Sequence, residues 1–421
     1  MTTQSLLGLS SNVKIPFIPL TYCLDESRPS ALNIIHTLRQ DWENDKIEIT
    51  RFTDGTTNTL LKVVNKLPEL SAEEIDNEAI LLRAYGQGTE LIIDREREAQ
   101  NHELLMQHKL APELLARFNN GMLYRFMRGS VTSPADLRKQ EVSLAIARRL
   151  AEWHAVVPCL QSPIKNSCNH IDQISVAQPT SIPKTTKLRE ELDSTHQENI
   201  SPNLWTVLQK WISALPTNTL AEKSRQQILQ KEMDRMILEL SNRPGLGNYS
   251  LVFAHCDLLS GNIVVLPQST VDANATLTVS FIDYEYAAPS PAAFDIANHF
   301  AEWGGFDCDY HQLPTRSQRI DFIREYIRSY YIHKHHEISD VDREAESKRL
   351  FSEVDLFRGL PGLFWGVWAL IQSKISKINF DYASYAETRL GEYWAWRNEN
   401  DGTRIASGGQ VPLREARWAE D

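Results

Sequence analysis

Segments that favour β-strands are gathered near the start of this 421-residue chain, and this clustering restricts its fold more than any other feature. Three apolar runs, 47–52, 57–64 and 79–86, have the length and composition of strands. A charged segment at 95–109 has helical spacing, and a fourth strand-like run follows at 122–129. Strands with one interposed helix in so short a stretch predict a compact α+β unit.

Helices dominate the rest of the chain. Apolar residues recur at helical spacing over 31–42, before the strands, and over 138–157, after them. Beyond residue 205 the pattern is mostly helical, interrupted by strand-like runs at 251–255, 262–266 and 277–284. The sequence therefore predicts a small sheet unit followed by a larger, mostly helical unit.

Composition excludes several classes of protein. The formal net charge is −11, whereas a protein that mainly binds nucleic acid would carry a basic stripe. The five cysteines are irregularly spaced, which predicts neither a disulfide framework nor a zinc site. We find no signal-peptide pattern and no apolar run of about 18 residues, so we expect no membrane span and a cytoplasmic location.

One motif carries chemistry. His255 precedes Asp257 by two residues, Asn262 follows after five more, and Asp283 ends the next strand-like run. This is the spacing of kinase-like phosphotransferases. An Asp carboxylate can take the proton of an acceptor hydroxyl, and amide and carboxylate oxygens are ligands that Mg²⁺ prefers. An Asp and an Asn in a loop can also simply cap local turns.

Several separated segments resemble the choline/ethanolamine kinase family, and they occur in the family's order. The similarity spans roughly residues 30–395 and is carried by 52–60, 81–86, 118–129, 282–303 and 364–376. It implies an α+β, two-lobed protein-kinase-like fold, with a small N-terminal sheet lobe and a larger, mostly helical C-terminal lobe.

The resemblance also divides the chain. We expect an N-terminal extension at 1–30, a nucleotide-binding lobe at 31–130 and a catalytic and acceptor-binding lobe at 131–400. Within the second lobe, 160–203 is rich in Pro, Ser, Thr and Asn, which predicts a loop or insert. The charged tail at 401–421 is expected to fray.

By resemblance, Asp257 is the catalytic base, Asn262 and Asp283 hold Mg²⁺, and His255 and Asp295 support the loop. Further residues are implied to bind ATP: a phosphate loop, an arginine on the third strand with its helix carboxylate, and a hinge for adenine. These are Gly55, Thr56, Thr57, Asn58, Arg83, Glu98, Tyr124, Phe126, Met127 and Gly129. Position 290 is Ser, where family members usually carry Asn.

The acceptor implied by the resemblance is a small cation that bears one hydroxyl. Aromatic rings with a nearby carboxylate suit such a cation, although Trp and Tyr at helical spacing also form ordinary cores. The implied acceptor residues are Glu302, Tyr310, Trp365, Trp368 and Tyr385.

The predicted function is ATP-dependent phosphorylation of ethanolamine, the first step of phosphatidylethanolamine synthesis by the cytidine-diphosphate route. Ethanolamine is favoured because Leu259 stands where choline kinases usually have Gln, and because 52–58 resembles the ethanolamine kinase form. Choline or dual activity, an aminoglycoside-type phosphotransferase and an inactive scaffold are the alternatives. The expected partners are ATP and a small amino alcohol; a homodimer is left open.

Overall fold

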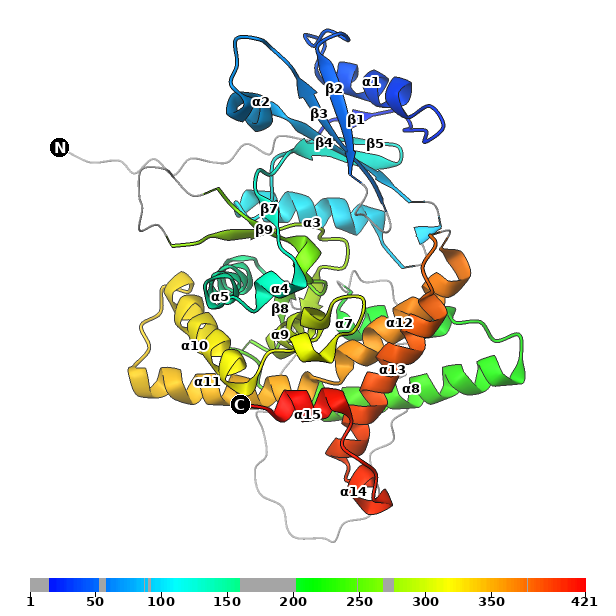
Figure 1. The fold of residues 1–421 in the computed structure, drawn as a ribbon, viewed down its shortest axis with the longest axis vertical. Coiled ribbons are helices and arrows are strands. Elements are labelled where there is room, and N and C mark those ends of the chain that lie inside the picture. The colour runs from blue at the N-terminus through cyan, green and yellow to red at the C-terminus, as the bar shows by residue number, and fades with distance from the viewer. Residues whose placement is uncertain are drawn as a thin grey trace, which may run out of the picture.

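The computed structural model describes residues 15–52, 58–86, 88–89, 92–159, 202–247, 249–267, 276–376 and 378–421. A twisted sheet lies at one end of the molecule, and a larger group of helices lies at the other (Figure 1). The predicted phosphate-loop residues Gly55, Thr56 and Thr57, and most of the predicted insert at 160–203, lie outside the described residues.

The N-terminal sheet has six strands in the order β1-β5-β6-β4-β3-β2. Its strands are β1 (Phe17–Ile18), β2 (Ile47–Phe52), β3 (Asn58–Asn65), β4 (Ile80–Tyr85), β5 (Leu114–Phe118) and β6 (Gly121–Arg125). All neighbouring pairs are antiparallel except β1 with β5. The four predicted strands are therefore confirmed, whereas β1, β5 and the short helix α2 (Ala72–Glu78) were not predicted.

Helix α1 occupies Ser27–Leu38 rather than the predicted 31–42. Pro29 lies in its first turn, where a missing N–H costs nothing because those donors have no partner within the helix. Trp42 follows the helix but is only 3% exposed, because it packs with Ile34 and Ile35 into the core of the sheet. The apolar Trp42 thus belongs to the core without belonging to the helix.

Helix α3 (Arg95–Gln107) lies between the sheet and the helical part (Figure 1). The Asp94 side chain caps it by accepting a hydrogen bond from the backbone N–H of Arg97. Glu98 and His102 are buried on one face, one turn apart. The position of α3 therefore brings Glu98 to the junction between the two parts of the molecule.

The helical part contains one large hydrophobic core. Its helices are α4 (Pro134–Leu137), α5 (Gln140–Val156), α7 (Leu204–Ala214), α8 (Leu220–Leu240), α9 (Ala292–Ala301), α10 (Arg316–His333), α11 (Asp340–Phe357), α12 (Leu360–Ile375) and α13 (Tyr382–Asn400). The predicted helix at 138–157 corresponds to α5. Its buried face carries Ile146, Leu150 and Trp153.

Short strands at the junction support the loops that carry the predicted motif. They are β7 (Ser130–Val131), β8 (Val252–Ala254), β9 (Ile263–Val265), β10 (Val279–Phe281) and β11 (Ala288–Ser290). Strand β9 pairs with both β7 and β10, and β8 pairs with β11. Because β8 and β9 bracket one loop and β10 and β11 bracket another, the two loops are held next to each other.

The tail was predicted to fray, and this prediction is wrong. Residues 401–421 form helices α14 (Thr403–Ser407) and α15 (Leu413–Ala419). Trp418 is 4% exposed, and its indole Nε1 donates to Asp355 Oδ1 at 2.7 Å. The guanidinium of Arg319 lies 4.0 Å from the centre of the Trp418 ring. One buried aromatic side chain and its cation therefore hold the tail on the fold.

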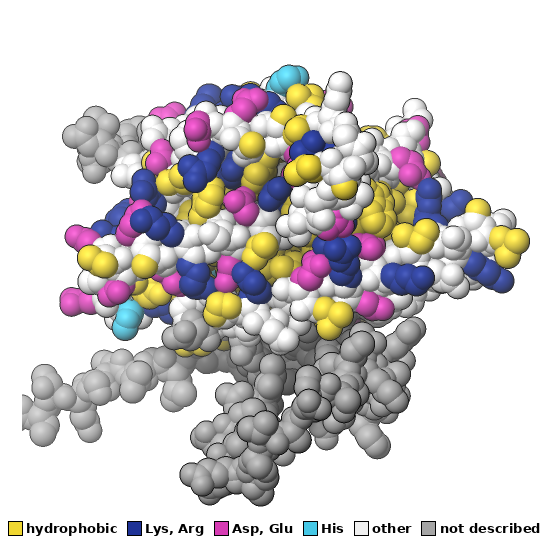
Figure 2. Space-filling view, turned by 90° about the horizontal axis from the view of Figure 1, so that it is seen from below, with side chains coloured by type: hydrophobic (Ala, Val, Ile, Leu, Met, Phe, Trp, Pro, Cys, Tyr) yellow, Lys and Arg dark blue, Asp and Glu magenta, His cyan; other side chains and the backbone are white. Residues whose placement is uncertain are grey.

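One helical run, 340–375, is long and apolar enough to cross a membrane by length and composition alone. However, this run comprises α11 and α12, and 78% of its most apolar stretch is buried inside the fold, as expected for core helices. Seen from below, Lys and Arg side chains are interspersed with Asp and Glu over the described surface (Figure 2).

Candidate active site

The loop between β8 and β9 presents Asp257 and Asn262 to the junction. Asn262 ends a short 3₁₀ turn and precedes β9. Its side-chain Nδ2 donates to the backbone carbonyl of Asp257 at 2.8 Å and to Asp257 Oδ2 at 3.0 Å. The two side chains are therefore locked together, and the orientation of the Asp257 carboxylate is fixed.

Asp295 of α9 holds the start of this loop. Its carboxylate accepts backbone hydrogen bonds from His255 at 2.9 Å and Cys256 at 2.8 Å, and it contacts His154 Nε2 at 3.0 Å. Burial alone would raise the pKa of Asp295, but these partners lower it below its usual range. Asp295 is therefore a buried, ionised anchor for the chain that leads to Asp257.

The backbone is strained at one residue of this anchor. Cys256 has φ 63°, a left-handed conformation that costs a non-glycine residue roughly 1–3 kcal/mol. The Asp295 contact to its N–H and the Asn298 side-chain contact to its carbonyl, 3.0 Å, hold it there. Ser290, at the position noted above, lies on this residue: its Oγ is 3.4 Å from Cys256 Sγ.

His255 connects the two loops. Its ring Nε2 lies 3.0 Å from the carbonyl of Ile282, and its Nδ1 accepts from the Asp257 N–H at 3.3 Å. Burial lowers the pKa of His255, so the ring is neutral. The ring thus fixes the distance between the Asp257 loop and the residue before Asp283.

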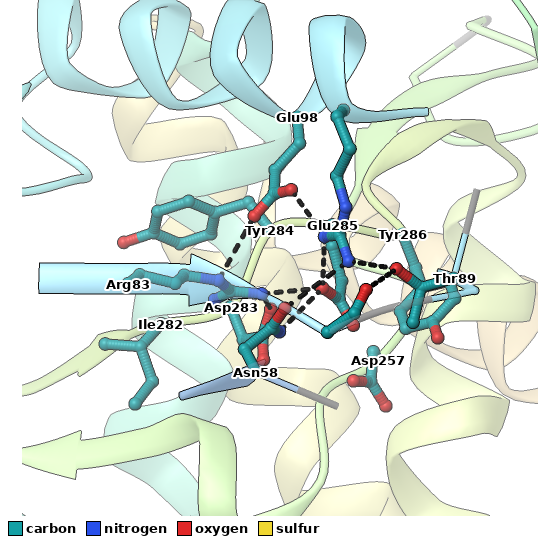
Figure 3. A network of polar contacts seen from close by, with 12 residues as sticks. Asn58, Arg83, Thr89, Glu98, Asp257, Ile282, Asp283, Tyr284, Glu285 and Tyr286 are labelled. Carbon is teal, nitrogen blue, oxygen red and sulfur yellow. Dashed lines mark hydrogen bonds and ion pairs between the residues drawn. The ribbon is translucent and has the colours of Figure 1, made fainter. Parts of the chain in front are cut away.

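Asp283 lies two residues beyond β10 and also has a left-handed backbone, with φ 65°. Arg83 Nη2 of β4 donates to Asp283 Oδ1 at 2.7 Å and to Glu285 Oε2 at 2.6 Å. Arg83 Nε lies 3.3 Å from Glu98 Oε1. The arginine of the sheet therefore pairs with three carboxylates, one of which is the predicted helix partner Glu98 (Figure 3).

Arg95 and Glu285 also belong to this network, but they were not predicted from the sequence. Arg95 Nη1 lies 2.8 Å from Glu98 Oε2 and 3.2 Å from Glu285 Oε2. Asn58 Nδ2 also donates to Glu285 Oε2, at 3.1 Å. Glu285 follows Asp283 by two residues, and Arg95 is the first residue of the charged helix. Their role is seen only in the structure, where opposite charges from the two segments pair across the junction.

Burial and like charges shift the proton affinities in the site. Burial raises the pKa of Asp257 well above its usual range, and the carboxylates of Asp283 and Glu302 raise it further. Burial, and next the charge of Asp283, raise the pKa of Glu285 to about 7. Asp257 is thus a stronger base than an ordinary carboxylate, which suits proton abstraction near neutral pH.

A cavity of about 360 Å³ runs through the junction and is lined by these groups. At the sheet end the lining is mostly apolar. It includes the predicted nucleotide residues Tyr124, Phe126, Met127 and Gly129, together with Phe52, Leu60, Leu81, Met122, Val131 and Val264. Gly129 is required here, because a Cβ would lie 2.4 Å from the Val265 carbonyl oxygen.

The other end of the cavity is lined by aromatic rings. Trp365 and Trp368 of α12 meet edge to face at 5.6 Å, and Tyr286 meets Trp365 at 5.4 Å. Each indole has a hydrogen-bond acceptor: Asn298 Oδ1 for Trp365 and the Tyr286 hydroxyl for Trp368, both at 2.8 Å. These bonds fix the rings as rigid walls.

The predicted acceptor residues Glu302 and Tyr385 also line this aromatic end, whereas Tyr310 does not line the cavity. Phe306 lines it instead, with its ring 5.9 Å from that of Tyr385. Tyr286 and Phe306 were not predicted. Phe306 lies outside the segments that carry the family resemblance, so the sequence offered no signal for it.

The donor set at the centre fits Mg²⁺. Asn262 uses Nδ2 for its two contacts to Asp257, so Oδ1 is the atom of that amide suited to a cation. The Asp283 side chain is 27% exposed, against 3% for Glu285. The described residues contain no cluster of three metal-binding side chains, but Mg²⁺ usually needs one or two carboxylates beside substrate phosphates and water.

Comparison with known proteins identifies the family. A family model described as choline/ethanolamine kinase matches residues 49–394. Ethanolamine kinase 1 of Mus musculus is 32% identical over 382 residues, 88% of this chain and 90% of that protein. Ethanolamine kinase 1 of Homo sapiens is 33% identical over 90% of this chain and 74% of its own length. The solved structure of a Plasmodium vivax ethanolamine kinase matches with TM-score 0.62 at 24% identity, covering 87% of this chain and 89% of its own.

The fold is two-lobed and protein-kinase-like, with a small sheet lobe and a larger helical lobe, as the sequence predicted. The match over most of the chain specifies the class further. The chain belongs to the choline/ethanolamine kinase family.

Proposed function

We propose that this protein transfers the γ-phosphoryl group of ATP to the hydroxyl of ethanolamine. The observation that carries the proposal is the position of Asp257 in one cavity, between the sheet end, where Arg83 pairs with Asp283 and Glu285, and the aromatic end. The relatives named ethanolamine kinase support this choice of acceptor. Leu259, which the sequence singled out for this choice, lines the same cavity.

In this proposal the chain binds and orients both substrates. Adenine lies among the apolar residues of the sheet end, beside Tyr124 and Met127, and Arg83 contacts the phosphates. Mg²⁺, held by Asn262 and Asp283, neutralises phosphate charge when bound. The ammonium group of the acceptor lies against the rings of Trp365 and Trp368, where aromatic faces attract a cation.

The chemical step needs one proton transfer. The acceptor oxygen attacks the γ-phosphorus, and a new O–P bond forms as the bond from phosphorus to the β,γ-bridging oxygen breaks. The hydroxyl proton passes to the carboxylate of Asp257, and ADP leaves. The raised pKa of Asp257 favours this acceptance. The product, phosphoethanolamine, then serves the cytidine-diphosphate route in the cytoplasm.

Choline is the second candidate, because aromatic walls also suit a quaternary ammonium. The test is ADP release and product identity with Mg-ATP and, in separate reactions, ethanolamine, choline and an aminoglycoside. We expect phosphoethanolamine as the main product and loss of turnover in Asp257→Asn. ATP consumption that is equal with and without each amino alcohol would overturn the proposal.

A further inference from the structure

The C-terminal helix α15 is connected to the aromatic end of the cavity by buried charges of alternating sign. Glu302, which lines the cavity, accepts a hydrogen bond from Arg389 Nη2 at 2.9 Å. Arg389 Nε lies 3.4 Å from Glu392 Oε2, and Arg414 Nε of α15 lies 3.9 Å from the same oxygen. The connection runs from the tail to the cavity wall through these four side chains.

Burial makes these charges interact strongly. The exposed fractions of the side chains are 7% for Glu302, 1% for Arg389, 4% for Glu392 and 3% for Arg414. In such surroundings a charge that loses its partner is costly, because water does not replace the lost interaction. Each ion pair therefore depends on the next.

Arg389 is the point at which the connection acts on the cavity. Besides its bond to Glu302, its guanidinium lies 5.8 Å from the centre of the Tyr385 ring, and Tyr385 also lines the cavity. Arg389 thus lies behind two cavity walls. The Arg389 guanidinium also interacts with Glu392. Burial opposes its positive charge, but the carboxylates of Glu392 and Glu302 raise the pKa of Arg389 above its usual range.

The contact between Arg389 and Glu392 is electrostatic only. Among the described residues, neither Arg389 Nε nor Glu392 Oε2 has a hydrogen-bond partner. Glu392 therefore has no directed bond at that oxygen to hold it in place, and the charge of Arg414 balances it instead. Arg414 is itself fixed by Glu415 Oε1 and the Arg358 carbonyl, both at 2.9 Å.

We propose that Arg414 is a positioning residue for the acceptor, which balances Glu392 so that Arg389 stays on Glu302 and Tyr385. Without the Arg414 charge, Glu392 draws the Arg389 guanidinium toward itself and loosens both cavity walls. None of these four side chains belongs to the sheet end of the cavity, so loss of the Arg414 charge should leave ATP binding unchanged. The inference rests on the proposed function, because it concerns the acceptor of that reaction.

The test is steady-state kinetics of the full chain with ethanolamine and Mg-ATP, comparing wild type with Arg414→Gln. We expect KM for ethanolamine to rise about three- to thirtyfold, which lies inside the range of coupling energies within one ion-pair network. KM for ATP should stay within about twofold of wild type. Arg417→Gln is the matched control, because Arg417 is on the same helix but contacts His311 and Glu420. It should leave both KM values unchanged.

The double variant Arg414→Gln/Glu392→Gln separates positioning from general damage. With both charges removed, Arg389 is left to Glu302, so KM for ethanolamine should return to within about threefold of wild type. An unchanged ethanolamine KM in Arg414→Gln would overturn the proposal. A double variant that folds but has a raised KM for ethanolamine would also overturn it. If Arg414→Gln does not fold, the KM of the double variant is the deciding measurement.

Failure of the inference is distinct from failure of the function. If wild type does not phosphorylate ethanolamine or choline, the proposed function is wrong. If wild type is active and the Arg414→Gln kinetics match those of Arg417→Gln, only the positioning role is wrong.

Discussion

The two ends of the cavity are built in different ways. At the sheet end, called the charged end for its ion pairs, Arg83 contacts Glu98, Asp283 and Glu285 (Figure 3). Arg95, which does not line the cavity, also contacts Glu98 and Glu285, so three separate segments of the chain meet here. At the other end, the rings of two tryptophans and three further aromatic residues surround one paired carboxylate. Asp257 lies between them and belongs to neither set.

The difference teaches how one cavity treats two substrates. Charged partners fix the polar side chains of the charged end through direct hydrogen bonds. Rings fix the opposite wall by shape, and the indole hydrogen bonds set their orientation. Substitutions at the charged end should therefore change mainly KM for ATP, and substitutions at the aromatic end should change mainly KM for the acceptor. Substitution of Asp257, between the two ends, should change mainly kcat.

The largest effect is expected for Asp257→Asn. The amide cannot accept the hydroxyl proton, so kcat should fall by roughly 10²–10⁴-fold, the usual contribution of a general base. Both KM values should stay near those of wild type. Asp340→Asn, at an exposed carboxylate, is the control for loss of one charge. Steady-state turnover that stays near normal in Asp257→Asn would remove this residue from its role.

Arg83→Gln tests the charged end. The buried carboxylates of Glu98 and Glu285 and the half-buried carboxylate of Asp283 lose a partner at once. This predicts a loss of about 3–5 kcal/mol in the free energy of unfolding. KM for ATP should rise more than KM for the acceptor. Arg125→Gln, on the same sheet but with exposed partners, should cost less than about 1 kcal/mol. Urea unfolding curves of equal midpoint for the two variants would contradict this account of the network.

The two ends share a sensitivity to acid. Burial lowers the pKa of His102, near the charged end, and of His299, behind the aromatic end, to about 4 each. In the unfolded chain a histidine takes up a proton below about pH 6.5, so each contributes stability that is lost as pH falls from 7 to 5. The expected loss is about 2 kcal/mol per histidine.

Buried carboxylates with raised pKa, such as Glu285, act in the opposite direction, so the informative quantity is a difference. We expect His299→Gln to lose about 2 kcal/mol less than wild type between pH 7 and pH 5. Gln can still donate to the Leu258 carbonyl, which His299 Nδ1 contacts at 2.8 Å. Equal pH dependence of unfolding in the two proteins would show that His299 is already charged in the fold.

Trp365→Ala tests the aromatic end and should have the smallest effect. Loss of one cation–π contact, about 0.5–2 kcal/mol, should raise KM for the acceptor about 2- to 30-fold and leave KM for ATP unchanged. Trp394→Ala, on α13 and away from this cavity, is the matched control. If KM for ATP rose instead, the division of the cavity into two ends would be wrong.

Groups that are local in sequence could be paired from their spacing, and distant groups such as Glu302 and Trp365 were brought together only by the family resemblance. Contacts that packing alone assembles could not be predicted. Asp257 and Asn262 lie on one loop, so their spacing is enough to pair them. Arg95 and Glu285 are distant in sequence, and the residues next to each of them in the sequence do not indicate that the two side chains are in contact. Phe306 lies on a short connection without periodicity, where the sequence gives no direction to a side chain.

The tail shows the same limit in the fold. Arg414, Glu415 and Trp418 lie in a charged segment that reads as solvated surface, because charged residues are rarely buried without partners. Their partners, such as Arg358 and Asp355, lie on another helix. Only the fold shows that these charges are paired and buried.

The most direct test of the central claim is the ratio of kcat/KM for ethanolamine over choline at fixed Mg-ATP, measured with wild type. Wild type should give a ratio well above one, with phosphoethanolamine as the product. A ratio below one would contradict ethanolamine as the preferred acceptor, and no turnover with either amino alcohol would contradict the whole assignment.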